Sequence, residues 1–368
     1  MMEPEWTKDY RTNALSKIES TPLPSYRYGL RILIKPPELR IKPKEAENFS
    51  ITIKNPEEIE IYSGKSIPDL PHFRPLFEIE EKEDRLSYTH KAYSNHFILI
   101  KISKKLQNPI ELIYDINDET FFSNIFILAE KDSEATILLK KMSDNFLSEH
   151  IKIILEKNSK INFISLQNLN KEAINIEKRV ALVKENAEMN WIDGSFGSIY
   201  SKSEIISQLN EKNAKSNIKV LYLTNNNQQK DIYTTSIHNS EETFSDILTK
   251  GVINGKSKAL SQGLVQINQN AAKSEGYEKQ EALLLSNEAE ADAIPNLLIH
   301  NHDVKCSHGS SIGQIDEEKL FYLMSRGLSR EQAIKKIVEG YFNPILDKFP
   351  KETRDALQNN LLQSLENE

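Results

Sequence analysis

The sequence is poor in cysteine and in glycine. Its 368 residues include one cysteine, Cys306, and 12 glycines. One cysteine excludes an intrachain disulfide, which fits a reducing compartment, and it excludes a closed set of thiolate ligands within this chain. Antiparallel hairpins usually need turns such as Asn-Gly, and Asn254-Gly255 is the one such pair. The sequence therefore does not favour a protein built from tight hairpins.

Strong positive charge, long apolar runs and a nucleotide-binding motif are also missing. Lys and Arg number 47 against 54 Asp and Glu, so the net charge is −7, a poor basis for binding nucleic acid. No stretch approaches 18 apolar residues, and the acidic start of the chain does not resemble a secretion signal. No Gly-x-x-x-x-Gly-Lys-Ser/Thr pattern occurs, so any ATP hydrolysis must belong to a partner. We expect a cytoplasmic protein that binds neither nucleic acid nor membrane.

The spacing of apolar residues and the proline content change twice along the sequence, which predicts three regions. Residues 1–94 form a mixed, irregular N-terminal region, with a short helix between Trp6 and Ile18 and proline-rich extended segments after it. Residues 95–315 contain short apolar runs every ten to fifteen residues, many of them alternating with period two, which predicts strands. Residues 316–368 form a C-terminal helical module.

Two architectures fit the strands of residues 95–315. No helices separate these strands, which disfavours a sheet built from βαβ units. Many similar strands with polar connectors favour a β-solenoid over a sandwich or barrel. The repeat is imprecise, and the pattern alone leaves the solenoid and the sandwich or barrel open.

The C-terminal module contains clear helix signals. Asp316 caps a first helix that ends at Gly327, and Ser329 to Gln332 form a capping box for a second helix. Pro344 is expected to stop or kink that second helix, and a last amphipathic helix is expected near residues 352–365. Apolar side chains recur at helical spacing in both: Leu320, Phe321, Leu323 and Met324, then Ala333, Ile334, Ile337, Val338 and Tyr341. Such a stripe is typical of a core face, and it is also a candidate surface for a partner.

The densest group of possible metal ligands contains His300, His302, Cys306 and His308. All four positions are even, so in an unbroken strand they would face the same side. Cys and His suit zinc and iron, but the spacing matches no closed zinc motif. The alternatives are a solvated strand face with incidental histidines and, for Cys306, a small buried hydrophobe. Elsewhere, Asp231 and His238 suggest acid–base chemistry but lack a nucleophile, and ordinary surface polarity accounts for them.

The region from 275 to 342 also contains longer motifs. They include Asp303–Gly309 (DVKCSHG), Gly313–Glu318 (GQIDEE) and Leu320–Ser329 (LFYLMSRGLS). Together they closely resemble the SufB/SufD family of the SUF iron–sulfur cluster assembly machinery. The Cys-Ser-His-Gly motif at 306–309 and the single cysteine are similar to SufD rather than SufB.

This resemblance implies a mainly β protein with a right-handed parallel β-helix core and helical regions on either side. It implies a non-catalytic scaffold that pairs with a SufB-like paralogue and binds the ABC-type ATPase SufC. A transient iron–sulfur cluster would form at the SufB–SufD interface and would not bind tightly to the isolated chain. Cys306 and His308 map onto family positions associated with that interface, whereas His300 and His302 are weaker candidates. A neighbouring cation such as Lys305 is expected to lower the thiol pKa.

Docking of SufC is expected on the C-terminal helices. The predicted contact residues are Leu320, Phe321, Arg326, Ile334, Val338 and Tyr341. One alternative is a homodimeric scaffold that acts with SufC alone. A second is a carbohydrate-active β-helix enzyme, which would need paired carboxylates on one face and usually a secretion signal.

Overall fold

The computed structural model describes residues 5–23, 26–28, 32–34, 47–56, 59–65, 73–79, 83–347, 351 and 354–355. Most of the helix expected near residues 352–365 lies outside this part of the chain. Helices α1 (Glu5–Ile18), α2 (Arg74–Phe77) and α3 (Arg85–Tyr93) precede the first long strand, and α4 (Glu317–Ser325) and α5 (Arg330–Leu346) follow the last. The helix predicted from Trp6 to Ile18 is thus confirmed. No described helix is long and apolar enough to span a membrane.

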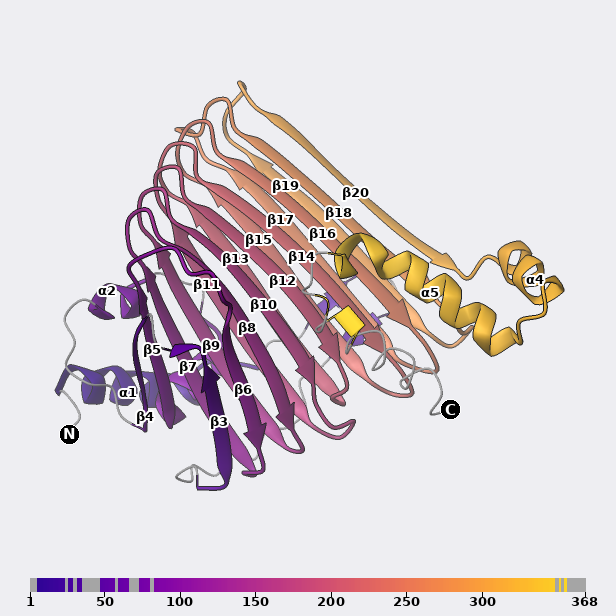
Figure 1. The fold of residues 1–368 in the computed structure, drawn as a ribbon, viewed down its shortest axis with the longest axis horizontal. Coiled ribbons are helices and arrows are strands. Elements are labelled where there is room, and N and C mark those ends of the chain that lie inside the picture. The colour runs from indigo at the N-terminus through magenta and orange to yellow at the C-terminus, as the bar shows by residue number, and fades with distance from the viewer. Residues whose placement is uncertain are drawn as a thin grey trace.

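Two nine-stranded sheets face each other and make up most of the molecule (Figure 1). The even sheet contains β3 (Phe49–Lys54), β6 (Ile110–Ile116), β8 (Glu134–Ser143), β10 (Lys160–Asn168), β12 (Glu188–Phe196), β14 (Lys215–Thr224), β16 (Phe244–Ile253), β18 (Glu275–Leu284) and β20 (Lys305–Gln314). The odd sheet contains β4 (Glu60–Gly64), β5 (His96–Ile102), β7 (Thr120–Ala129), β9 (Phe146–Leu155), β11 (Ile174–Val183), β13 (Tyr200–Leu209), β15 (Gln229–His238), β17 (Lys258–Ile267) and β19 (Glu290–Ile299).

From β5 onwards, consecutive strands alternate between the two sheets, and each pairs in parallel with the strand two places along the chain. Lys215 pairs with Glu188 and Phe244 pairs with Lys215, for example, so each turn stacks directly on the one before. The result is a parallel β-solenoid of about eight turns, as the resemblance implied. A sandwich or barrel of antiparallel hairpins is excluded, because β3 and β4 are the only described strands that pair antiparallel within these two sheets.

The corners of the solenoid explain why the chain needs so few glycines. Asp132, Asn158, Asn186 and Asn213 occupy the left-handed backbone region that a tight corner requires, with φ between 56° and 62°. Their side chains stack along one edge: Asn158 Nδ2 donates to Asp132 Oδ1 at 2.7 Å, and Asn213 Nδ2 donates to Asn186 Oδ1 at 3.0 Å. Gly255, from the one Asn-Gly pair, lies at a solenoid corner and not in a hairpin.

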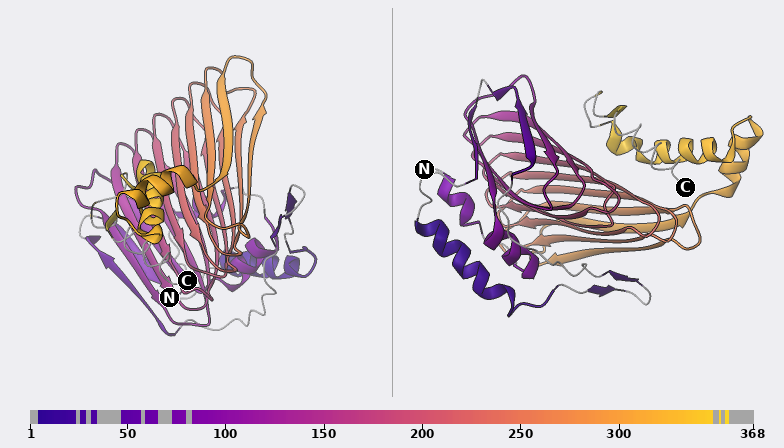
Figure 2. Two further views of the ribbon diagram at one scale, coloured as in Figure 1. Left: turned by 90° about the vertical axis from the view of Figure 1, so that its right-hand side faces the viewer. Right: turned by 90° about the horizontal axis from the view of Figure 1, so that it is seen from below.

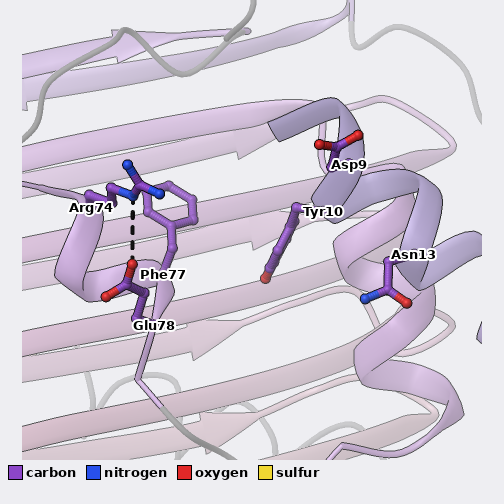
Figure 3. Close-up of a pocket in the computed structure, with 6 residues that line it drawn as sticks. All are labelled: Asp9, Tyr10, Asn13, Arg74, Phe77 and Glu78. Carbon is purple, nitrogen blue, oxygen red and sulfur yellow. Dashed lines mark ion pairs between the residues drawn. The ribbon is translucent and has the colours of Figure 1, made fainter. Parts of the chain in front are cut away.

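Helices cover the outer faces of the two sheets on opposite sides of the solenoid (Figure 2). On the even sheet, Val338, Phe342 and Ile345 of α5 form one apolar cluster with side chains of β8 to β16. On the odd sheet, Phe77 of α2 packs on Phe126 of β7, with ring centroids 4.3 Å apart. A hollow lies between α1 and α2, lined by Tyr10, Phe77 and four polar side chains (Figure 3). Because these helices lie on the faces of the sheets, the two ends of the solenoid are its remaining surfaces.

The helix signals at the C-terminus are mostly confirmed. Asp316 caps α4 by accepting from the backbone N–H groups of Glu318 and Lys319, and Ser329 and Gln332 form the capping box of α5. Gly327 has a φ of +96°, as expected for the residue that ends a helix. Pro344 lies inside the last turn of α5, and the helix ends two residues later at Leu346. Pro344 therefore does not stop the helix at its own position, since a proline there costs one backbone hydrogen bond near the C-terminus, and the alternative that it kinks the helix stays a prediction.

Candidate functional site

The last turn of the solenoid, made by β19 and β20, is open in the described part of the chain. β20 pairs with β18 and β19 with β17, and no described strand pairs with their other edges. Nine of the ten residues of β20 are exposed, whereas the middle strands are largely buried. Leu298, Ile299 and Ile312 remain more than 40% exposed there. Unpaired edges and exposed apolar side chains are usual features of a surface that binds another protein.

Cys306 and His308 both lie on β20, on the side that faces the inside of the solenoid. Cys306 packs against the central apolar cluster, and alternation along the strand places His308 on the same side. Their partners in register on β18 are Gly276 and Glu278. Cys306 is half-buried and His308 is exposed, because no further turn covers them.

His300 and His302 do not share that strand. Strand β19 ends at Ile299 and β20 begins at Lys305, so both histidines lie in the connecting loop. The expectation that all four candidates face one side of an unbroken strand was therefore wrong. The loop is a tight turn in which the Asn301 side chain accepts from the backbone N–H of Asp303 at 2.8 Å.

The environment of the Cys306 thiol also differs from expectation. Burial raises the pKa of the thiol, and a backbone hydrogen bond involving Gly276 opposes this only in part. Lys305 does not lower this pKa, because its amine forms an ion pair with Glu275 at 2.9 Å. The isolated chain therefore holds Cys306 as a thiol rather than as an activated thiolate.

Glu278 is the unusual neighbour of these two residues. It is 3% exposed, and its Oε1 accepts from Gln280 Nε2 at 2.5 Å. Its Oε2 and the Gln280 Oε1 have no hydrogen-bond partner although both are buried. Burial raises the pKa of Glu278 to about 7, and the contacts with Gln280 and the Asn296 backbone oppose this shift. The sequence analysis missed this pair, although a charged residue at an inward position of an alternating strand was a readable signal.

Within the described residues, no group of three or more His, Cys, Asp or Glu side chains is arranged to hold a metal ion. Iron–sulfur clusters need about four protein ligands, mostly thiolates. Cys306 and His308 alone therefore do not make up such a ligand set.

The residues predicted to dock a partner divide into two groups. Leu320 and Val338 are buried, and Ile334 and Tyr341 are partly buried with α5 against the even sheet. These four cannot contact a partner fully without leaving the fold. The exposed group is on α4 and just after it: Phe321 is 73% exposed, and Arg326 lies over the ring of the exposed Tyr322, 5.2 Å from its centroid.

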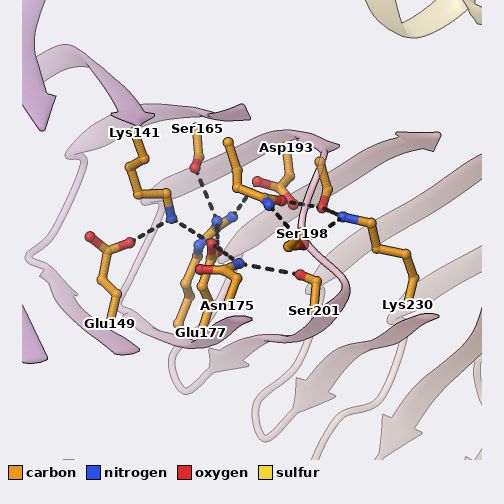
Figure 4. A network of polar contacts seen from close by, with 12 residues as sticks. Lys141, Glu149, Ser165, Asn175, Glu177, Asp193, Ser198, Ser201 and Lys230 are labelled. Carbon is orange, nitrogen blue, oxygen red and sulfur yellow. Dashed lines mark hydrogen bonds and ion pairs between the residues drawn. The ribbon is translucent and has the colours of Figure 1, made fainter. Parts of the chain in front are cut away.

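A second polar group lies inside the middle of the solenoid (Figure 4). Lys141 binds Glu149 at 2.8 Å and Glu177 at 2.5 Å, and Arg179 binds Glu177 and also Asp193 at 2.8 Å. Although burial raises it, Lys141 and Arg179 hold the pKa of Glu177 below its ordinary value. All five side chains are buried, so this network serves the interior of the fold.

Asp231 and His238, which the sequence analysis assigned to surface polarity, are both buried. The two ring nitrogens of His238 contact the hydroxyls of Thr243 and Ser245, at 2.7 and 2.8 Å. The surface interpretation was wrong, because alternation points His238 inward. Paired as it is with two hydroxyls, His238 holds strands together and has no place for a substrate.

The family model described as "SUF system FeS cluster assembly, SufBD core domain" matches residues 112–341. These residues make up more than half of the chain. The chain belongs to the SufB/SufD family of iron–sulfur cluster assembly proteins. The predicted resemblance is thus confirmed, and the match includes Cys306, His308 and most of the two C-terminal helices.

Individual relatives agree. A SufBD family iron–sulfur cluster assembly protein of Mycobacterium leprae is 29% identical over 74% of this chain, which covers 32% of that protein's length. SufBD family proteins of Staphylococcus haemolyticus and Staphylococcus aureus are each 24% identical over 95% of this chain and 87% of their own length.

Proposed function

We propose that this chain is a SufD-like scaffold subunit that joins a SufB-like paralogue through the open end of its solenoid. In this proposal an iron–sulfur cluster is the product assembled at that joint, and Cys306 and His308 supply ligands to it. The ATPase SufC binds the exposed surface of α4. The chain itself performs no hydrolysis, and it acts in the cytoplasm. In this proposal residues 1–94 act as a cover, residues 95–315 as the scaffold core, and residues 316–368 as the docking module.

The backbone of β20 carries the proposal. The N–H group of Lys305 donates to the carbonyl of Ser274, directly before β18, and that of Ile315 donates to the carbonyl of Leu284 at its end, at 3.0 Å each. In a parallel ladder the odd positions between them do the same, so the even positions direct their N–H and C=O groups to the open edge. From Cys306 to Gln314 no Asp, Glu, Lys or Arg interrupts this edge. An edge that lacks charges and prolines is suited to pair with a strand of another chain.

The same even positions place Cys306 and His308 at the joint. Their side chains face the inside of the solenoid, where a second solenoid joined edge to edge would extend the enclosed space. Ligands from the partner would then complete the set that the isolated chain lacks. A thiol that burial keeps protonated in the free subunit would ionise when it binds iron, as thiolate ligands do.

Exposed aromatic side chains support α4 as the surface for SufC. Phe321 and Tyr322 project from a helix that stands beyond the edge of the solenoid, as Figure 1 shows. A few aromatic and arginine side chains carry most of the energy of many interfaces. Leu320 and Val338, which the sequence analysis included, act in this proposal as the support beneath that surface.

Reconstitution of cluster assembly tests the proposal. The chain is mixed with a SufB-like paralogue, SufC, ATP, ferrous iron, a sulfide source and a reductant, and the visible absorbance of the cluster is followed. The isolated chain should stay colourless, and His308→Ala should lower the yield without loss of complex formation. Wild-type yield from His308→Ala, Cys306→Ala and the double variant would overturn the site. Assembly without any paralogue would instead support the homodimeric scaffold.

A further inference from the structure

Two buried oxygen atoms at the open end have no hydrogen-bond partner of their own, although Gln280 and the Asn296 backbone contact the Glu278 carboxyl, and both atoms can only accept. They are Oε2 of Glu278, when that carboxyl is ionised, and Oε1 of Gln280. A buried polar atom without a partner costs on the order of 1–3 kcal/mol, and a bound water, ion or ligand is one way to offset that cost. An anion does not satisfy two acceptors, whereas a cation does.

The two oxygens lie beside the exposed histidine of the last strand. Glu278 is the register partner of His308, and Gln280 is the register partner of Ser310. Neighbouring strands lie about 4.8 Å apart, and side chains in register point to the same side of the sheet. The side chains of Glu278, Gln280 and His308 therefore lie on the same, inward side of two neighbouring strands at the mouth of the solenoid.

The opposite wall leaves room for this arrangement. Gly263 of β17 faces the pair across the interior, and a Cβ at that position would lie 1.5 Å from Glu278 Oε1 and 2.6 Å from Gln280 Nε2. The carboxylate and the amide thus occupy space that any other residue would fill. Because Gly263 has no side chain, two polar side chains fit into a part of the interior where apolar residues are otherwise expected.

We infer that Glu278, Gln280 and His308 form a divalent-metal site that receives ferrous iron at the mouth of the solenoid. Carboxylate, carbonyl oxygen and imidazole suit Fe²⁺ and its chemical neighbours better than they suit a finished cluster, which prefers thiolates. The inference rests on the proposed function for the identity of the cargo. Three ligands from one chain hold the ion weakly, which allows it to pass to the thiolates of the completed joint.

Titration of the metal-free full-length chain with Co²⁺ tests the site directly. Co²⁺ stands in for ferrous iron, and its visible ligand-field bands report both binding and coordination. The wild-type chain should bind one Co²⁺. Glu278→Gln should weaken binding by about a factor of ten or more. Removal of a residue that only supports a metal ligand already costs about that much affinity, and Glu278 is proposed as a ligand itself. Thermal unfolding of both proteins checks that the isosteric variant remains folded.

Two further variants make the result specific. Glu275→Gln is the matched control, because Glu275 lies on the same strand and pairs with Lys305 on the outside. It should bind Co²⁺ as the wild type does. His308→Ala should weaken binding as well, and the double variant of Glu278→Gln with His308→Ala should lose less than the sum of the two free-energy changes, since both residues hold one ion. Unchanged Co²⁺ affinity in folded Glu278→Gln, or strictly additive losses, would overturn the inference.

The inference and the proposed function fail separately. If His308→Ala lowers cluster yield while Glu278→Gln leaves Co²⁺ binding unchanged, the scaffold assignment stands and the iron site is wrong. If Glu278→Gln weakens Co²⁺ binding while neither His308→Ala nor Cys306→Ala affects cluster assembly, the metal site stands and the cluster assignment is wrong.

Discussion

The two ends of the solenoid are built differently. At the first end β3 and β4 run antiparallel to β6 and β5, and the Phe49 ring packs on Phe121 with centroids 4.8 Å apart. At the last end β19 and β20 run parallel to their neighbours, and apolar side chains such as Ile312 stay exposed. A reversed strand cannot continue the winding, so the first end stops within the chain itself. The last end keeps the parallel pairing of the preceding turns, so a further strand could be added to it.

This difference supports the open end as the proposed site of a partner. Proteins protect sheet edges with charges, prolines, bulges or covering elements, because an unprotected edge pairs with other chains. The first end has such a cover, and the last described strand has none. We therefore attribute the stability of the chain to the closed end and middle, and its function to the open end.

The largest expected effect is a difference between the two ends in how much one substitution lowers the free energy of unfolding. Phe121→Ala removes a fully buried ring at the closed end and should lower the free energy of unfolding by about 3–5 kcal/mol. Urea denaturation measures this loss. Ile312→Ala at the open end should lower the stability of the isolated chain by only about 1 kcal/mol, since the side chain is 42% exposed. Equal losses at the two ends would contradict the comparison.

A smaller effect concerns pH and the enclosed histidine. Burial lowers the pKa of His238 from 6.5 to about 4, so the unfolded chain binds more protons between these values. Its contribution to stability is complete above pH 6.5 and is lost as the pH falls towards 4. Relative to His238→Gln, the wild type should lose about 2 kcal/mol between pH 7 and pH 5.

Chemical denaturation at the two pH values measures that difference. His302→Gln in the exposed loop is the control, and its stability should follow the wild type at both pH values. A constant difference between wild type and His238→Gln from pH 7 to pH 5 would show that His238 is not held neutral by its surroundings.

The smallest of these effects concerns the helix beyond the open end. Phe321→Ser should weaken SufC binding by roughly tenfold, equivalent to about 1.4 kcal/mol, because an exposed aromatic anchor is lost. Isothermal calorimetry with purified SufC measures it, and the circular dichroism should not change. Lys336→Ser on the exposed side of α5 is the matched control. Undiminished binding by Phe321→Ser would move the SufC surface away from α4.

Periodicity predicted the strands of residues 95–315 but not their arrangement. Hydrophobic alternation is local, whereas the solenoid depends on corners, and here Asn and Asp replace the glycines that commonly mark them. The covering strand Phe49–Lys54 was placed in an irregular region, although its exposure alternates along its whole length. Neighbouring prolines hid that signal, and antiparallel pairing across 57 residues, as between Lys54 and Glu111, has no local signature.

The candidate site was predictable only where residues lie on one strand. Cys306 and His308 share β20 as alternation predicts, but the turn at Asn301 separates them from His300 and His302. Glu278 and Gln280 lie about 30 positions earlier, and only the register of the solenoid brings them beside the motif. Burial of Leu320 and Val338 also depends on tertiary packing, because an amphipathic helix does not reveal which neighbour covers it.

The most direct test of the open end is the Ser310→Pro variant in a co-purification with the SufB-like paralogue. Ser310 is at an even position, so its N–H faces the open edge, and proline there removes a donor to a partner while sparing the ladder to β18. Size-exclusion chromatography with light scattering gives the mass of the complex, and Ser310→Ala is the control. The account predicts a folded variant that no longer captures the paralogue. Capture at the wild-type level by folded Ser310→Pro would contradict it.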